Sequence, residues 1–165
     1  MAHKAVVTVK AREGIKEMLR EVAKEKGDLS LAMLVQTLPE VRERWTLVVS
    51  APWADSSGSR SVISYLSSKL IPKYVDRYAL SAIDRISVMQ SDDPRVRAIL
   101  EHFESYHIDV SVKGGFPLRN TIVTTGVGED WVLGDGYVFV ADANANGRSS
   151  AQTKAAHIRA EARKA

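Results

Sequence analysis

The chain has 165 residues, of which 45% are hydrophobic and 26% are charged, and it contains no cysteine. These values are ordinary for one globular domain, and the absence of cysteine excludes disulfides, thiol nucleophiles and thiolate zinc sites. The net charge of +3 resides in residues 142–165, which hold five basic and two acidic residues, whereas the preceding 141 residues hold eighteen of each. Because residues 1–141 carry no net charge, we do not expect a nucleic-acid-binding face on the folded domain.

Hydropathy argues against a membrane protein. No apolar run approaches the roughly 20 residues that span a bilayer, and the N-terminal "MAHKAVVTVK" lacks the apolar core of a secretory signal. We therefore expect no membrane insertion and a cytoplasmic location.

The first third of the chain predicts one strand and two helices. Residues 3–9, "HKAVVTV", alternate loosely and predict a strand. Residues 11–27 predict a helix, because Ile15, Met18, Leu19 and Val22 recur at helical spacing and Gly27 suits a C-cap. Asp28 is then expected to cap a second, apolar helix, "LSLAMLVQTL", which Pro39 ends.

The middle of the chain predicts alternating strands and helices. A buried strand over 45–51 ends at Pro52, a turn over 54–59 follows, and a helix runs over 60–71. A further helical piece over 75–83 precedes a strand over 85–90. The segment "SDDPRVRAILEHFESY" predicts a helix with Asp93 as N-cap and Pro94 in its first turn.

The last part of the chain predicts strands over 108–112, 119–126 and 130–141, partly antiparallel, with a turn at "KGGFP". Together the elements predict a mixed α/β fold. A mainly parallel central sheet would have helices on its faces and antiparallel strands near the C-terminus. We expect residues 1–141 to form a single domain and residues 142–165 to form a basic linker and a polar tail helix.

Two loops are the candidate ligand site, because open α/β sheets bind ligands at the carboxyl ends of parallel strands. They follow strands 45–51 and 85–90, and their polar residues are Asp55, Ser56, Ser57, Ser59 and Arg60, facing Ser91, Asp92 and Asp93. Backbone N–H groups at the helix starts and Arg60 suit an anion, and Asp55 and Asp92 suit Mg²⁺. The alternative is that these residues are only turn formers, since no P-loop or dinucleotide fingerprint is present.

The histidines and tryptophans do not form a recognisable catalytic motif. The four histidines form no metal-binding motif, no nucleophile elbow is present, and solvent-facing histidines are expected. Of the three tryptophans, Trp53 borders the candidate loop and is the one that we consider as a ligand contact.

A partial calcium-loop pattern begins at Asp142. Asp142, Asn144, Asn146 and Gly147 match positions 1, 3, 5 and 6, but Thr153 stands where a bidentate acid is needed. A capping box formed by Ser149 and Gln152 favours a linker followed by a tail helix instead.

Two functions remain open at this point. The leading hypothesis is a small cytosolic binding or accessory protein whose basic tail contacts a protein partner or nucleic acid. The alternative is a magnesium-dependent enzyme or binder that acts on a phosphorylated small molecule or nucleotide at the two loops. The lack of a convincing base, nucleophile or metal triad decides this order. No cofactor is assigned, and magnesium is the candidate for the two loops.

Overall fold

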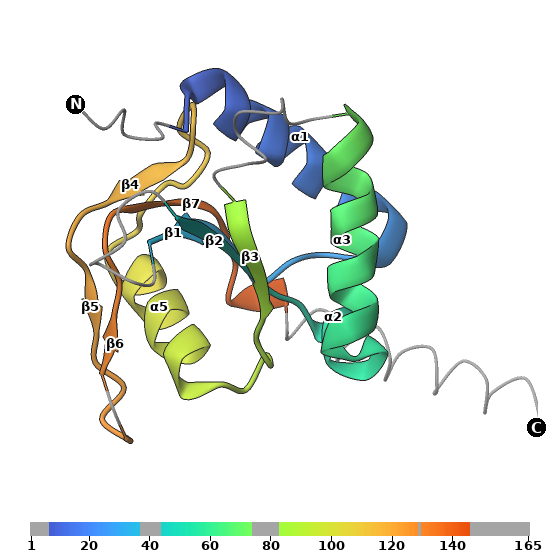
Figure 1. The fold of residues 1–165 in the computed structure, drawn as a ribbon. Helices are drawn as coiled ribbons and strands as arrows, with labels where there is room; N and C mark the ends of the chain where they lie inside the picture. The colour runs from blue at the N-terminus through green and yellow to red at the C-terminus, as the bar shows by residue number, and fades with distance from the viewer. Residues whose placement is uncertain (1–6, 37–43, 74–82, 129, 146–165) are drawn as a thin grey trace, which may run out of the picture.

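The computed structural model describes residues 7–36, 44–73, 83–128 and 130–145 (Figure 1). In chain order its elements are α1 (Val9–Lys26), β1 (Leu31–Val35), β2 (Trp45–Ser50), α2 (Pro52–Ser57), α3 (Ser59–Lys73), β3 (Ile83–Val88), α5 (Pro94–Ser105), β4 (Phe116–Leu118), β5 (Ile122–Val123), β6 (Trp131–Val132) and β7 (Gly136–Ala141).

The central sheet has five strands in the order β3-β2-β1-β7-β4, and β5 and β6 form a second, two-stranded sheet. Within the central sheet only β2 and β3 are parallel, whereas β1–β2, β1–β7 and β4–β7 are antiparallel. The α/β class and the antiparallel strands near the C-terminus are confirmed, but the prediction of a mainly parallel sheet is wrong. The physical reason is connectivity: only β2 and β3 are joined by a helical crossover, here α2 and α3, of the kind that parallel pairing requires.

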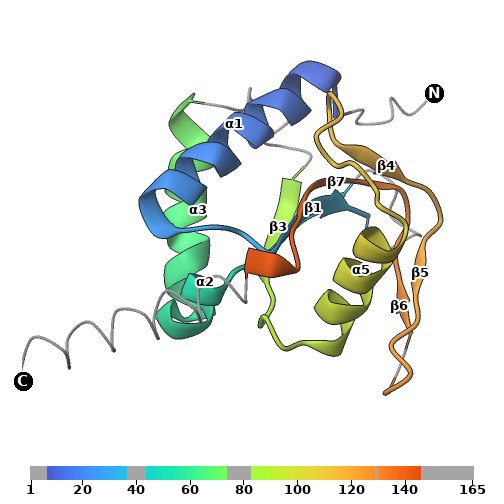
Figure 2. The ribbon, with the colours of Figure 1, turned by 180° about the vertical axis from the view of Figure 1, so that it is seen from behind.

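Helices cover both faces of the central sheet. Figures 1 and 2 show α1 and α3 on one face and α5, with β5 and β6, on the other. Successive residues of β2 face opposite layers: Leu47 and Val49 pack with α1 and α3, whereas Val48 packs with α5. The molecule therefore has two apolar cores separated by one sheet.

Helix α1 confirms the helix predicted over 11–27. The Thr8 side chain accepts a hydrogen bond from Ala11 N at 3.1 Å and caps its start, and Gly27, with φ of 121°, ends it. The strand predicted over 3–9 is wrong for its described part, because Thr8 is a cap and Val9 already belongs to the helix. Residues 3–6 of that prediction lie outside the described residues.

The helix predicted after Asp28 is a strand. All five residues of β1 are buried, and the strand lies between β2 and β7. A continuous apolar run fits a buried helix and a buried central strand equally well. Pairing with two neighbouring strands satisfies the backbone of β1 on both sides, and this tertiary contact decides the outcome.

Three smaller predictions also differ from the structure. The turn predicted over 54–59 is largely the short helix α2, which Gly58 separates from α3. The strand predicted over 108–112 is an irregular loop, in which the carboxylate of Asp109 accepts hydrogen bonds from the backbone N–H and the hydroxyl of Ser111. The helix predicted over 75–83 lies outside the described residues except for Ile83, which begins β3.

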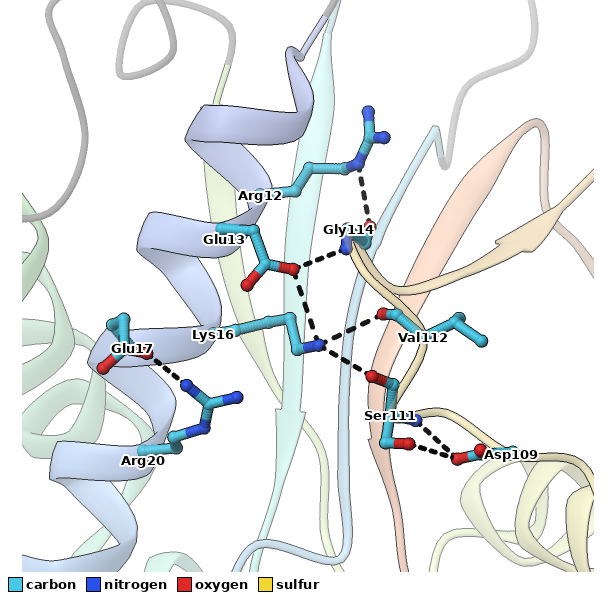
Figure 3. Close-up of polar contacts among 9 residues, drawn as sticks. All are labelled: Arg12, Glu13, Lys16, Glu17, Arg20, Asp109, Ser111, Val112 and Gly114. Atoms are coloured by element: carbon cyan, nitrogen blue, oxygen red, sulfur yellow. Dashed lines mark hydrogen bonds and ion pairs between the residues drawn. The ribbon is translucent and has the colours of Figure 1, made fainter.

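A polar network ties this loop to α1 (Figure 3). The ammonium of Lys16, a side chain only 9% exposed, donates to the carbonyls of Ser111 at 3.3 Å and Val112 at 3.1 Å. Glu13 accepts from Gly114 N at 2.6 Å, and that backbone hydrogen bond is the main reason why the pKa of Glu13 is lowered. Arg12 donates to the carbonyl of Gly114 at 2.8 Å. The loop is thus held by side chains where no strand pairing holds it.

Candidate functional site

The two loops predicted to form a site do meet in the structure. Because β2 and β3 are parallel neighbours, the segments that follow them leave the same edge of the sheet. The carboxylate of Asp55, on α2, accepts a hydrogen bond from Ser91 N at 3.0 Å. We call these two segments, residues 50–60 and 89–93, the strand-end loops.

Most of the polar side chains on α2 serve local structure. The hydroxyls of Ser56 and Ser57 donate to the carbonyl of Trp53 at 3.1 and 3.0 Å. Ser59 and Arg60 are exposed at the start of α3, and Asp92 is exposed in the loop before α5. Among the interactions of the described residues, none joins Asp55 with Asp92 or with Arg60, so these three side chains do not form a preassembled cluster.

Asp93 is a helix cap, as the sequence predicts. Its carboxylate accepts from Arg95 N at 2.9 Å and from two nitrogens of the Arg95 guanidinium at 3.1 and 3.0 Å. The hydrogen bonds from the Arg95 side chain are the largest influence that lowers the pKa of Asp93. This residue therefore stabilises the start of α5 and has little capacity left for a ligand.

Two hydroxyls lie at the strand-end loops, one of them on Ser91, which the sequence had placed there, and the other on Ser50, which it had not. Ser50 is fully buried at the end of β2, and Ser91 follows β3. The side-chain oxygens of both are buried without a hydrogen-bond partner among the described residues. Buried hydroxyls normally have a partner, protein or water. The sequence signal was a serine at the end of an otherwise apolar strand, which is too common to single out.

Trp53, the tryptophan considered as a ligand contact, is used in packing. Its indole N–H donates to the carbonyl of Gly27 at 3.1 Å, and its ring lies edge-on to Tyr65 with centroids 6.5 Å apart. It joins the end of α1 to α2 and α3. His102 and His107 are solvent-exposed, as expected, while His3 and His157 lie outside the described residues.

A cavity lies elsewhere, between α5 and the β4–β5 segment. Its volume is about 360 Å³. The apolar residues of its lining are Ala98, Ile99, Phe103, Ile108, Phe116, Leu118, Ile122, Val123 and Leu133. His102, Thr121 and Thr124 complete the lining with polar groups. We call it the α5 cavity. No sequence pattern indicated it, because its walls come from segments that only the tertiary fold brings together.

The calcium-like pattern is only partly visible. The carboxylate of Asp142 accepts a hydrogen bond from Asn144 N at 3.0 Å, as in an ordinary Asx turn. Residues 146–153 of the pattern, and the tail helix predicted after them, lie outside the described residues. In the part of the chain that the structure describes, no three acidic or histidine side chains gather in a way that could hold a metal ion.

Comparisons with known proteins give no relative from which a role can be transferred. No protein-family model, no curated protein and no solved structure matches the chain. Of the described helices, none combines the length and the apolar character needed to cross a bilayer.

Proposed function

We propose that this protein is a non-catalytic binding protein whose ligand is a small molecule with a mainly apolar body. The observation that carries the proposal is the α5 cavity, about 360 Å³ in volume and lined mostly by aliphatic and aromatic side chains. Ligand cavities are commonly about 300–1,000 Å³, apolar, and marked by a few polar groups that fix orientation. His102, Thr121 and Thr124 are the polar groups of this cavity.

The outer wall of the cavity suits ligand entry. Ile122 of β5 lines the cavity and is 61% exposed, and Val132, its partner on β6, is 50% exposed. Two paired strands alone are marginally stable, so this small sheet can move outward at low cost. Ligand binding that covers part of Ile122 and Val132 would account for the exposure of these apolar side chains.

Cavity filling tests the proposal. Ala98 lines the cavity from α5, so Ala98→Phe places a ring inside it, whereas Glu101→Phe adds the same ring to an exposed position on α5 outside the lining. The probe is anilinonaphthalene sulfonate, followed by a thermal-shift panel of small apolar alcohols, acids and aromatic compounds. We expect saturable binding by the native chain and by Glu101→Phe, and its loss in Ala98→Phe. Equal binding by both variants, or no saturable binding by the native chain, contradicts the proposal.

A second candidate is magnesium-dependent binding of a phosphorylated small molecule or nucleotide at the strand-end loops. The contact between Asp55 and Ser91 N favours it, because it brings the two loops together at the carboxyl ends of parallel strands. One oxygen of Asp55 remains for a cation, Asp92 would supply another ligand, and Arg60 would contact the anion. Ser56, Ser57 and Ser59 would then be peripheral.

Nucleotide titrations with and without magnesium distinguish this candidate. It requires a rise in unfolding temperature that depends on magnesium and disappears in Asp55→Asn and Arg60→Gln. A rise that is independent of magnesium or unchanged in both variants excludes it.

The contact of the basic tail with a partner or nucleic acid stays a prediction, because the tail lies outside the described residues. It would be supported by binding to short nucleic acids that is lost when residues 146–165 are removed, and contradicted by binding that survives that removal.

A further inference from the structure

A second, smaller cavity lies on the α5 face of the β2–β3 pair and has a different chemistry. Its volume is about 190 Å³, and it is lined by Thr46 and Val48 of β2, Arg85 and Ser87 of β3, Met89, Arg95 and Trp131. We call it the arginine groove. It contains two guanidinium groups, two hydroxyl groups and no carboxylate in its lining. It shares no lining residue with the α5 cavity.

A bulge precedes Arg85 in β3. Trp45 pairs with Ile83, but the next residue, Thr46, pairs with Arg85, so Asp84 is an additional residue in β3. From Arg85 onward the pairing is regular: Arg85 lies beside Thr46 and Ser87 beside Val48, on the α5 face, whereas Ile86 and Val88 pack on the face of α1 and α3. The acidic neighbour Asp84 pairs instead with Arg44 at 3.7 Å.

The two arginines retain most of their donors. No described residue forms an ion pair with Arg85, which is exposed. Arg95 directs two of its nitrogens to Asp93, which leaves about three of its five N–H groups available. Its guanidinium lies 5.2 Å from the centroid of the Trp131 ring, which fixes its position at the groove wall. Two guanidinium groups, from β3 and from α5, thus line the same small cavity.

We propose that the arginine groove binds the phosphoryl group of a small phosphorylated molecule. A phosphomonoester carries a charge of about −1.5 to −2 at neutral pH. Arg85 supplies a positive charge, and Arg95, although paired with Asp93, keeps further N–H donors. Guanidinium donors bind phosphate oxygens in pairs, with charge-assisted hydrogen bonds. The hydroxyl of Ser87 adds a neutral polar group to the lining. Free phosphate and an organic phosphomonoester share this chemistry.

The experiment is a titration of the native, ¹⁵N-labelled chain with inorganic phosphate, glycerol phosphate and acetate, without magnesium. The signals to follow are the side-chain N–H groups of Arg85, Arg95 and Trp131. We expect saturable shifts of these signals with the phosphates and weaker binding of acetate. Tighter binding of glycerol phosphate than of phosphate identifies an organic phosphomonoester, whereas equal binding identifies the free anion.

Arg85→Gln is the decisive variant, and Arg97→Gln is its matched control, since Arg97 is exposed on α5 outside the lining. Loss of one guanidinium should weaken phosphate binding about tenfold or more, while Arg97→Gln and Ala98→Phe should leave it unchanged. Equal losses in Arg85→Gln and Arg97→Gln indicate only general charge attraction and overturn the proposal. Preference for acetate, or no saturable shift in the native chain, does the same.

Discussion

Asp93 is the residue whose local role the sequence and the structure agree on most closely. It caps α5 through Arg95 N and pairs with the Arg95 side chain, and its own side chain is 20% exposed. Because the pKa of the folded carboxyl is lowered below its ordinary value of 3.8, the charged form is favoured by folding. Its stabilising contribution is therefore fully present above about pH 4 and is lost as the pH falls through the folded pKa.

Asp93→Asn tests this contribution, because asparagine can still cap a helix while the charge is removed. We expect a loss of about 0.5 kcal/mol in the free energy of unfolding at pH 7, since Arg95 is partly exposed and solvent screens the pair. The difference between the native chain and the variant should shrink as the pH falls below 3.8 and through the lowered pKa of the folded carboxyl. Urea unfolding across the acidic range measures it, and a difference that is constant with pH would contradict the assignment.

A comparison of Gly115 with Gly128 distinguishes the energetic cost of backbone strain from the cost of close packing. Both have positive φ, 85° and 87°. A Cβ added at Gly115 would lie 2.8 Å from the Phe139 ring, whereas at Gly128 no atom lies within 4 Å. We expect Gly128→Ala to cost about 1 kcal/mol for the left-handed conformation alone, and Gly115→Ala to cost about 1–3 kcal/mol more. Chemical unfolding of both variants measures these losses of unfolding free energy. Equal losses would show that the Phe139 ring can shift to make room for the added Cβ at no energetic cost.

At the scale of elements, the Lys16 network replaces strand pairing for the loop over 109–115. We predict that Lys16→Met destabilises the protein by about 1–3 kcal/mol, because the carbonyls of Ser111 and Val112 lose a charged donor. The amide of Gly114 should exchange with solvent faster. Lys10→Met, an exposed position of the same helix, is the control and should change neither quantity. Unchanged exchange at Gly114 in Lys16→Met would mean that Arg12 and Glu13 hold the loop alone.

Elements with signals in their own sequence were predictable. Helices α1 and α5 combine helical apolar spacing with a cap at one end, so their positions followed from local residues. Strand β1 was not predictable, because its run of apolar residues fits a buried helix equally well until β2 and β7 are placed beside it. The parallel β2–β3 pair was predictable from its crossover, but the antiparallel pairing of β1 with β2 and β7 was not.

One part of the candidate sites was likewise predictable from the sequence, and another part was not. The sequence predicted that the two loops meet, because loops that follow neighbouring parallel strands leave the same end of the sheet. The hydrogen bond between Asp55 and Ser91 N agrees with this prediction. Alternation along β3 places Arg85 and Ser87 on the face opposite Ile86 and Val88. The arginine groove was nevertheless not predictable, because Arg95 of α5 and Trp131 of β6 join these residues only in the tertiary fold.

For the whole molecule, the boundary between body and tail can be tested by truncation. Asp142 N donates to the carbonyl of Ser30 at 2.7 Å, and Ala145 is 2% exposed. We predict that a chain ending at Ala145 keeps the unfolding midpoint of the full chain. A chain ending at Ala141 should keep the fold with a midpoint lowered by a few degrees, since one backbone hydrogen bond and a small buried surface are lost. A large drop on ending at Ala145 would show that later residues are integral to the body.

The bulge at Asp84 also bears on self-association. Strand β3 is one edge of the central sheet, and edge strands can recruit a strand from another molecule. An irregular ladder with adjacent exposed charges, Asp84 and Arg85, is a poor template for such pairing. We therefore expect this edge to pair poorly with a strand of a second copy. Removing Asp84 should straighten the edge and promote aggregation, which sedimentation at rising concentration would detect.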